Sequence, residues 1–410
     1  MKKSLSCSLL LLVAHLLVSS SIVFAQDVRS VVTANNQFAF DLYARYQSKE
    51  GNIFFSAYSI SSAMAMTYEG ARGKTADEIQ SVFHFPKDDS LRRESFLNIN
   101  NQINKKDKKY ELRTANALWA QKDCPFLEDY FNLIAQYYGG KATNLDFINE
   151  TEKSRLTINS WIEEQTNNKI KDLIPAGIIN PLIRLVITNA VYFKGFWFKQ
   201  FDKKATEDKD FRVSPGNTIK TPMMHFSDEE AKFNYAETDQ LQILELSYEG
   251  KELSMLILLP RGDDLKAIEE SLSAEKLYGW KKLLSREEVI VYLPKFKFET
   301  KYFISRDLAA MGMPTAFTPG IDFGGEADFS GMTGKRDLRI SEVIHQAFVD
   351  VNEEGTEAAA ATAVVMRTGS VGMPRQKKIF NADHPFIFII QENATGNILF
   401  LGRVTNPITT

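Results

Sequence analysis

The chain has 410 residues, of which 44% are hydrophobic and 25% are charged, the proportions of an ordinary globular protein. A formal net charge of -3 gives no sign of the strongly basic surface that nucleic-acid binding needs. Length alone would allow several domains, but no internal repeat and no low-complexity linker divides the chain. We therefore expect one large domain from residue 26 to residue 410.

The first 25 residues have the pattern of a secretory signal peptide. Two lysines precede an apolar stretch from Leu9 to Val18, and Val23 and Ala25 have the spacing of a small-residue cleavage site. The apolar stretch is shorter than the ~20 residues of a membrane-spanning helix, although a retained anchor stays an alternative. We expect residues 1–25 to be removed and the mature protein to be secreted or extracellular, or periplasmic in a bacterium, with no membrane span.

Cleavage after residue 25 would remove Cys7 and leave Cys124 as the single cysteine of the mature chain. A single thiol cannot form an intramolecular disulfide, so the exported chain would depend on its hydrophobic core alone. Asn149 and Asn393 each begin an Asn-x-Thr glycosylation acceptor, which matters only in a eukaryotic secretory route.

Helical patterns dominate the first third of the chain. Ser59 to Glu69 is rich in small residues and is followed by Gly70, whereas Thr75 and Glu78 have the spacing of a capping box. Apolar residues at helical spacing predict the other helices, at Asn35 to Tyr46, at Leu127 to Tyr138 and around Ile158, Trp161 and Ile162.

Strand patterns follow in the rest of the chain. The run from Arg184 to Phe193 is apolar enough for a central strand, and His345 to Asn352 is a second strand candidate. The stretches LQILELSY and ELSMLILLP predict a hairpin, VIVYLPKFKF alternates as a strand does, and PFIFII and ILFLGRV close the chain. Helices first and strands afterwards indicate an α+β fold.

The sequence has no pattern of an enzyme. It lacks the G-x-S-x-G, H-E-x-x-H and G-x-x-x-x-G-K-[ST] motifs and any paired-cysteine motif. The histidines at positions 84, 225, 345 and 384 are scattered, and none has a second histidine at metal-ligand spacing. We expect no catalytic residues, no cofactor and no metal.

Six stretches, in order along the chain, resemble the serpin family. They are NIFFSAYSISSAMAMTYEGARGKTADEI, TNAVYFKGFW, VYLPKFKFE, VNEEGTEAAAATAVV, FNADHPFIFII and LFLGRVTNP. The resemblance implies a serpin fold of three β-sheets and about nine helices, with an exposed reactive-centre loop at about residues 353–378. It also implies a monomer that inhibits serine endopeptidases as a suicide substrate: the target protease forms a covalent acyl complex, and the cleaved loop inserts into the main sheet.

The composition of the expected hinge suits insertion as a strand. Alternate side chains of a strand face opposite sides, so placing Thr356 inward also places small residues inward as far as Thr362. The charges of Glu357 and Arg367 fall on the other face, and Gly355 can adopt the backbone angles of a hinge. The hinge comprises Glu353, Gly355, Thr356, Glu357, Ala358, Ala359, Ala360, Ala361 and Thr362. An Ala-rich surface helix is the alternative interpretation of this run.

The resemblance also implies roles for residues outside the loop. Ser56, Asn189 and His345 match a polar cluster beneath the main sheet, which would act as a hydrogen-bonded latch where the strands part. Trp197 matches an aromatic residue at the top of the sheet, and Lys295 would form an ion pair with Glu353 at the same point. An ordinary core contact is the alternative for each.

The family's spacing places the cleaved bond between Gly369 and Ser370. Because glycine offers a protease pocket nothing to hold, Arg367–Thr368 is the alternative for a trypsin-like enzyme. Val365 or Met366 would suit an elastase-like pocket.

Three other interpretations stay open. A non-inhibitory serpin-like carrier or chaperone is one, and an inhibitor that traps cysteine proteases through the same loop is another. The third is that the basic residues Arg375, Lys377 and Lys378 steer a protease or bind a polyanion.

Overall fold

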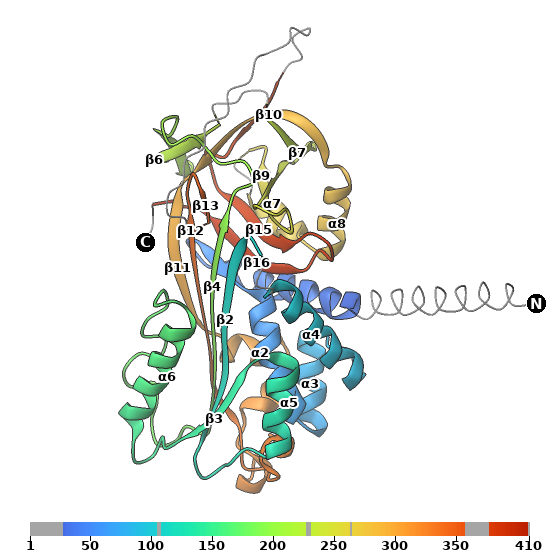
Figure 1. The fold of residues 1–410 in the computed structure, drawn as a ribbon, viewed down its shortest axis with the longest axis vertical. Coiled ribbons are helices and arrows are strands. Elements are labelled where there is room, and N and C mark those ends of the chain that lie inside the picture. The colour runs from blue at the N-terminus through green and yellow to red at the C-terminus, as the bar shows by residue number, and fades with distance from the viewer. Residues whose placement is uncertain (1–27, 105–107, 227–230, 263–264, 357–376, 409–410) are drawn as a thin grey trace, which may run out of the picture.

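The computed structural model describes residues 28–104, 108–226, 231–262, 265–356 and 377–408 (Figure 1). The expected signal peptide lies outside these residues. Residues 28–46 are helical. The other α-helices are α2 (Ala57–Gly70), α3 (Gly73–Phe83), α4 (Asp89–Ile103), α5 (Glu128–Tyr138), α6 (Thr151–Gln165), α7 (Leu265–Ser271), α8 (Ala274–Lys282), α9 (Ser305–Met311) and α10 (Ser330–Thr333).

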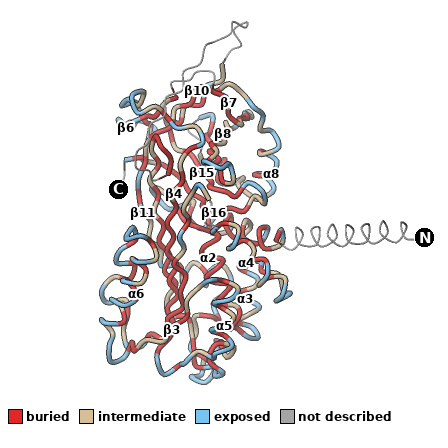
Figure 2. Tube along the Cα trace, in the orientation of Figure 1, coloured by how far each residue is buried: buried red, intermediate tan, exposed pale blue. Residues whose placement is uncertain are grey.

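The main sheet has six strands in the order β11-β12-β13-β4-β2-β3. These are β2 (Tyr110–Gln121), β3 (Lys141–Leu145), β4 (Leu185–Phe196), β11 (Phe296–Phe303), β12 (Ile340–Val351) and β13 (Gly355–Thr356). The predicted central strand is β4, which is buried along nearly its whole length (Figure 2). Its neighbour β12 runs parallel to it, whereas β2 runs antiparallel.

The remaining strands form a ten-stranded assembly that strand β10 divides in two. They are β1 (Ile53–Phe55), β5 (Glu207–Ser214), β6 (Asn217–His225), β7 (Lys232–Glu237), β8 (Leu241–Ser247), β9 (Leu253–Pro260), β10 (Ser285–Pro294), β14 (Lys378–Asn381), β15 (Phe386–Glu392) and β16 (Ile398–Val404). The first residues of β10 pair with β7, and its later residues pair with β14 and β6. With the main sheet, this division yields the expected three sheets.

Helices cover both faces of the lower main sheet (Figure 1). Helix α6 packs on one face through a small core that includes Trp119, Ile158, Ile162 and Ala190. Helices α2 to α5 lie on the opposite face, where the large core continues into the upper sheets. Residues alternate between these two cores along β2 and β4, and this explains why the sequence of β4 is continuously apolar.

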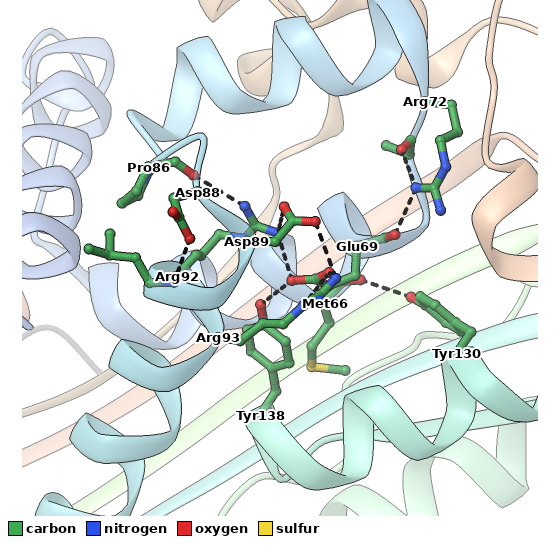
Figure 3. A network of polar contacts seen from close by, with 12 residues as sticks. Met66, Glu69, Arg72, Pro86, Asp88, Asp89, Arg92, Arg93, Tyr130 and Tyr138 are labelled. Carbon is green, nitrogen blue, oxygen red and sulfur yellow. Dashed lines mark hydrogen bonds and ion pairs between the residues drawn. The ribbon is translucent and has the colours of Figure 1, made fainter. Parts of the chain in front are cut away.

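A buried ion-pair network joins helices α2, α4 and α5 behind the sheet (Figure 3). The Glu69 carboxylate lies 2.8 Å from Arg92 and 2.6 Å from Arg93, and it accepts a 2.6 Å hydrogen bond from the hydroxyl of Tyr138. The side chains of Glu69 and Arg92 are each only 1% exposed. Because Arg92 and Arg93 of α4 and Tyr138 of α5 all contact Glu69 of α2, the network links the three helices.

Two details of the predicted elements are wrong. The stretch VIVYLPKFKF does not form one strand: it is divided between β10 and β11, which belong to different sheets, and the break falls at Lys295. The expected capping box at Thr75 does not form, because α3 begins at Gly73. The Glu78 carboxylate instead accepts a 2.9 Å hydrogen bond from the backbone of Thr315, so tertiary contacts replaced the local ones.

Candidate functional site

The chain reverses direction at the top of the main sheet, directly after β12. Asn352 and Gly355 exchange backbone hydrogen bonds of 2.9 and 3.2 Å, which makes Glu353 and Glu354 the tip of a two-residue hairpin. Gly355 has φ +157°, and a Cβ atom there would lie 2.0 Å from the carbonyl oxygen of Gly195. Only glycine fits this close approach of two backbones, which gives the predicted hinge glycine a physical reason.

The short strand β13, which follows the hairpin, lies between β12 and β4. Thr356 pairs with Val351 on one side and with Gly195 on the other, and both pairings are antiparallel. Below this point β12 and β4 pair directly with each other, from Phe348 opposite Tyr192 downwards. Gly355 and Thr356 therefore hold the sheet apart at its top, above a seam where β12 and β4 pair in parallel.

Trp197 positions the hairpin from the end of β4. Its ring nitrogen donates a 3.0 Å hydrogen bond to the carbonyl of Asn352, and its backbone nitrogen donates to the carbonyl of Glu354 at 2.8 Å. The indole ring stacks on Tyr248 with a centroid distance of 4.6 Å. The hydroxyl of Tyr248 in turn lies 2.8 Å from that of Thr356, so the inward face predicted for Thr356 is the face it presents.

Two ion pairs hold the acidic tip. Glu353 lies 2.9 Å from the ammonium of Lys295, the pair that the family resemblance implies, and accepts a 2.8 Å hydrogen bond from Thr206. Burial opposes ionisation of Glu353, but the hydrogen bonds from Lys295 and Thr206 outweigh it and lower its pKa. Glu354 pairs with Lys203, a contact that sequence reasoning missed because no periodicity links the two residues.

The three residues of the predicted latch meet beneath the seam. The backbone N–H of Ser56 donates to Nε2 of His345 at 3.1 Å, and Nδ1 of His345 contacts the side-chain oxygen of Asn189. Asn189 also donates a 2.6 Å hydrogen bond to Ser59 and contacts Asn116. The cluster thus joins α2 to β12, β4 and β2, the strands on both sides of the seam.

His345 is fully buried in this cluster, and burial lowers its pKa to about 3. Because Nε2 accepts from a backbone N–H, the proton of the neutral ring resides on Nδ1 and is donated to Asn189. Sequence reasoning missed Ser59 and Asn116. Asn116 is a polar residue in the mainly apolar second half of β2, and this was the one signal that could have indicated its place in the cluster.

A family model described as serpin (serine protease inhibitor) matches residues 33–407. The chain belongs to the serpin family. Membership supports protease inhibition as the activity of this serpin and fits a protein that is not an enzyme. It also implies a protease as the partner.

Relatives of this serpin span nearly its whole length. An uncharacterized serpin-like protein of Methanosarcina acetivorans is 44% identical over 383 residues, which are 92% of this chain and 88% of the relative. The human leukocyte elastase inhibitor is 42% identical over 384 residues, covering 92% and 99% of the two chains. A crystal structure of human thyroxine-binding globulin complexed with thyroxine aligns with a TM-score of 0.83 at 30% identity, covering 93% and 100%.

Most of the expected reactive-centre loop lies outside the described residues. This holds for hinge residues 357–362, for both candidate bonds (Gly369–Ser370 and Arg367–Thr368) and for Arg375. The ends of the loop differ from the expectation of an exposed segment: residues 353–356 are buried in the hairpin and β13, and Lys378 begins β14. Lys378 forms an ion pair with Glu237, which reduces the charge it can offer to a polyanion.

The described residues also bear on the expectations about membranes and metals. Within the described ranges, no helix is long and apolar enough to cross a bilayer. In the same ranges, no group of three or more histidine, cysteine, aspartate or glutamate side chains is arranged to hold a metal ion.

Proposed function

We propose that this serpin inhibits serine endopeptidases as a suicide substrate, by inserting its cleaved loop between β12 and β4. The observation that carries the proposal is the placement of β13. Thr356 already lies antiparallel to both neighbours at the top of a seam where those neighbours pair in parallel. Parallel pairing is the slightly less stable type, so an added strand would replace one parallel ladder with two antiparallel ladders.

The register of β13 predicts where each inserted residue would lie. Continuing the pairing of Thr356 with Gly195 places Glu357 opposite Lys194, where the two charges would attract each other. The same register places Thr362 opposite both Asn189 and His345, the two latch residues that face each other across the closed seam. A threonine hydroxyl at that position can take over hydrogen bonds that the latch loses when the strands part.

The same register bears on the cleaved bond. Met366 would lie opposite Leu185, the first residue of β4, so the inserted strand would be complete by about residue 366. Cleavage after Arg367 or after Gly369 would then leave the acyl-linked protease at the far end of the sheet in both cases. Cleavage at the earlier bond, Arg367–Thr368, would therefore not shorten the inserted strand, and both bonds stay candidates.

The target class follows from the loop sequence and from one relative. Val365 and Met366 would suit an elastase-like pocket, and the name of the leukocyte elastase inhibitor points the same way. Arg367 would suit a trypsin-like pocket. We further infer that the protein acts as a secreted monomer, on the basis of its N-terminal 25 residues and of one continuous fold with a self-contained site.

Incubation of the purified protein with elastase-like and trypsin-like proteases tests the proposal. We expect a complex that survives denaturing electrophoresis, and the N-terminus of the released peptide should fall within residues 366–371. The variant Ala360→Arg places a charge on the inward face and should turn the inhibitor into a cleaved substrate. Its control, Glu357→Gln, changes the other face and should still form the complex.

The leading alternative is a non-inhibitory carrier, which the similarity to thyroxine-binding globulin favours. Nicking the loop with a non-target protease separates the two. An inserting loop should raise the thermal unfolding midpoint by more than about 10 °C, because about ten residues gain ladder hydrogen bonds at roughly 1 kcal/mol each. If the unfolding midpoint stayed unchanged and no protease formed a complex, the non-inhibitory carrier would be the supported interpretation.

A further inference from the structure

The segment between α6 and β4 packs together with α6 on one face of the main sheet (Figure 1). Two hydrogen bonds of 2.9 Å join the side chain of Asn159 in α6 to the backbone of Ile174, and Arg155 donates a third to the carbonyl of the same residue. Helix and segment therefore form one unit, which we call the cover (residues 151–183).

The cover is packed mainly on the strands at one side of the seam. Among the described residues, Ile344 is the one that β12 contributes to its apolar core, whereas β2 and β4 contribute Ala115, Ala117, Trp119, Val186 and Ala190. The ammonium of Lys141 in β3 lies 5.2 Å from the ring centroids of both Trp119 and Trp161, which adds a further contact on this side. We therefore expect the cover to stay with β2, β3 and β4 when β12 moves away from β4.

A hydrogen bond reaches the cover from the other side of the seam. The ammonium of Lys301 in β11 donates 2.8 Å to the backbone carbonyl of Asp172 in the cover. Strand β11 pairs with β12 along its whole length, from Phe296 opposite Val351 to Phe303 opposite Ile344, so these two strands should move together. The bond between Lys301 and Asp172 therefore spans the seam.

The surroundings of this bond indicate a specific contact. Asp172 has φ +48°, in the left-handed region that residues other than glycine seldom adopt, although aspartate tolerates it better than most. Burial lowers the pKa of Lys301, while the negative charges of Glu299 and Asp172 oppose this shift. The ammonium is thus partly withdrawn from water where it meets the carbonyl, unlike that of a fully solvated surface lysine.

Opening the seam for one more strand moves β12 away from β4 by about 4.8 Å. A hydrogen bond does not extend beyond about 3.5 Å, so the bond of Lys301 cannot persist in its present form. We propose that Lys301 is a positioning residue that holds the seam closed before cleavage and is released from Asp172 when the loop inserts. This inference rests on the function proposed above, to which it adds a restraint on the insertion step.

The variant Lys301→Met tests the inference, because it keeps the length of the side chain without the donor. The bond is present in the uncleaved protein and is expected to be absent after insertion. The variant should therefore raise the unfolding equilibrium constant of the uncleaved protein about fivefold, as for one ordinary hydrogen bond, and leave that of the nicked protein unchanged. With a protease that the parent traps, insertion should be faster, so the excess of inhibitor consumed over protease trapped should fall about fivefold.

The control variant is Lys297→Met, which removes the same charge from the same strand. The ammonium of Lys297 lies 3.3 Å from Asp350 of β12, so its contact stays on one side of the seam. The control should consume the same excess of inhibitor as the parent. An equal excess in the two variants, or equal destabilisation of the uncleaved and nicked forms by Lys301→Met, would overturn the inference. A parent that neither traps a protease nor gains stability on nicking would instead contradict the proposed function, and the restraint with it.

Discussion

Acidification tests the latch through His345. Its pKa is about 3 in the folded protein, against about 6.5 for an unperturbed histidine in an unfolded chain. Between these values the unfolded state binds a proton that the folded state does not, so His345 makes no difference above pH 6.5 and lowers stability as the pH falls below it. At pH 5 the cost is about 2 kcal/mol, from 1.5 pH units at about 1.4 kcal/mol each.

The variant His345→Gln isolates this contribution. Glutamine can accept from Ser56 and donate to Asn189 but cannot titrate, so the variant should lose about 2 kcal/mol less than the parent between pH 7.5 and pH 5. Urea unfolding followed by tryptophan fluorescence at both pH values measures the difference. The groups that contact the ring are neutral, namely the Ser56 N–H, the Asn189 amide and the Tyr302 ring. If both proteins lost the same free energy, the ring would not be held neutral and the argument would fail.

Three further predictions concern other buried groups. Glu69→Gln should lower the free energy of unfolding in urea by about 3–5 kcal/mol, because buried Arg92 then lacks its anion. The control Glu94→Gln, at an exposed position, should change the free energy of unfolding by less than about 0.5 kcal/mol. Burial and Asp337 raise the pKa of the Cys124 thiol to about 11. A chain that starts at residue 26, with Cys124 as its only thiol, should therefore react with a disulfide reagent at pH 8 at least about 100-fold faster when denatured than when folded. Equal rates in the two states would contradict this. Lys203→Gln leaves buried Glu354 unpaired and should speed hydrogen exchange of residues 352–356, and unchanged exchange would show that the pair does not hold the hairpin.

The parts that could be predicted from the sequence are those that a local pattern carries. The apolar run of β4 and the hairpin of β8 and β9 are visible as periodicity. The latch residues and the pair of Lys295 with Glu353 were found through family resemblance, because they are distant along the chain and have no pattern of their own. Their proximity is a product of the fold, and the structure brings each set together.

What the sequence could not predict depends on strand partners. Strand β10 changes its pairing partners along its length, and the stretch VIVYLPKFKF is divided between two sheets. Neither feature alters the alternation of side chains, so periodicity in the sequence cannot reveal either one. The same limit applies to the hairpin at Glu353 and Glu354. The composition of the hinge predicts that it can become a strand, but only the pairing of Thr356 on both sides shows that it has begun to be one.

The seam and the hinge have complementary physical properties. The seam joins β12 and β4 in parallel, and it is crossed by a polar cluster whose hydrogen bonds other groups can replace. The hinge supplies a run of small side chains that can pass between strands without a steric or charged obstacle. Glu353 and Glu354 tie the top of the hinge to Lys295 and Lys203. Among the described residues, Gly355 and Thr356 are the ones that separate β12 from β4. Cleavage would remove the tether at the other end of the loop while leaving these ties intact, and the loop would then be free to follow a path that β13 already defines.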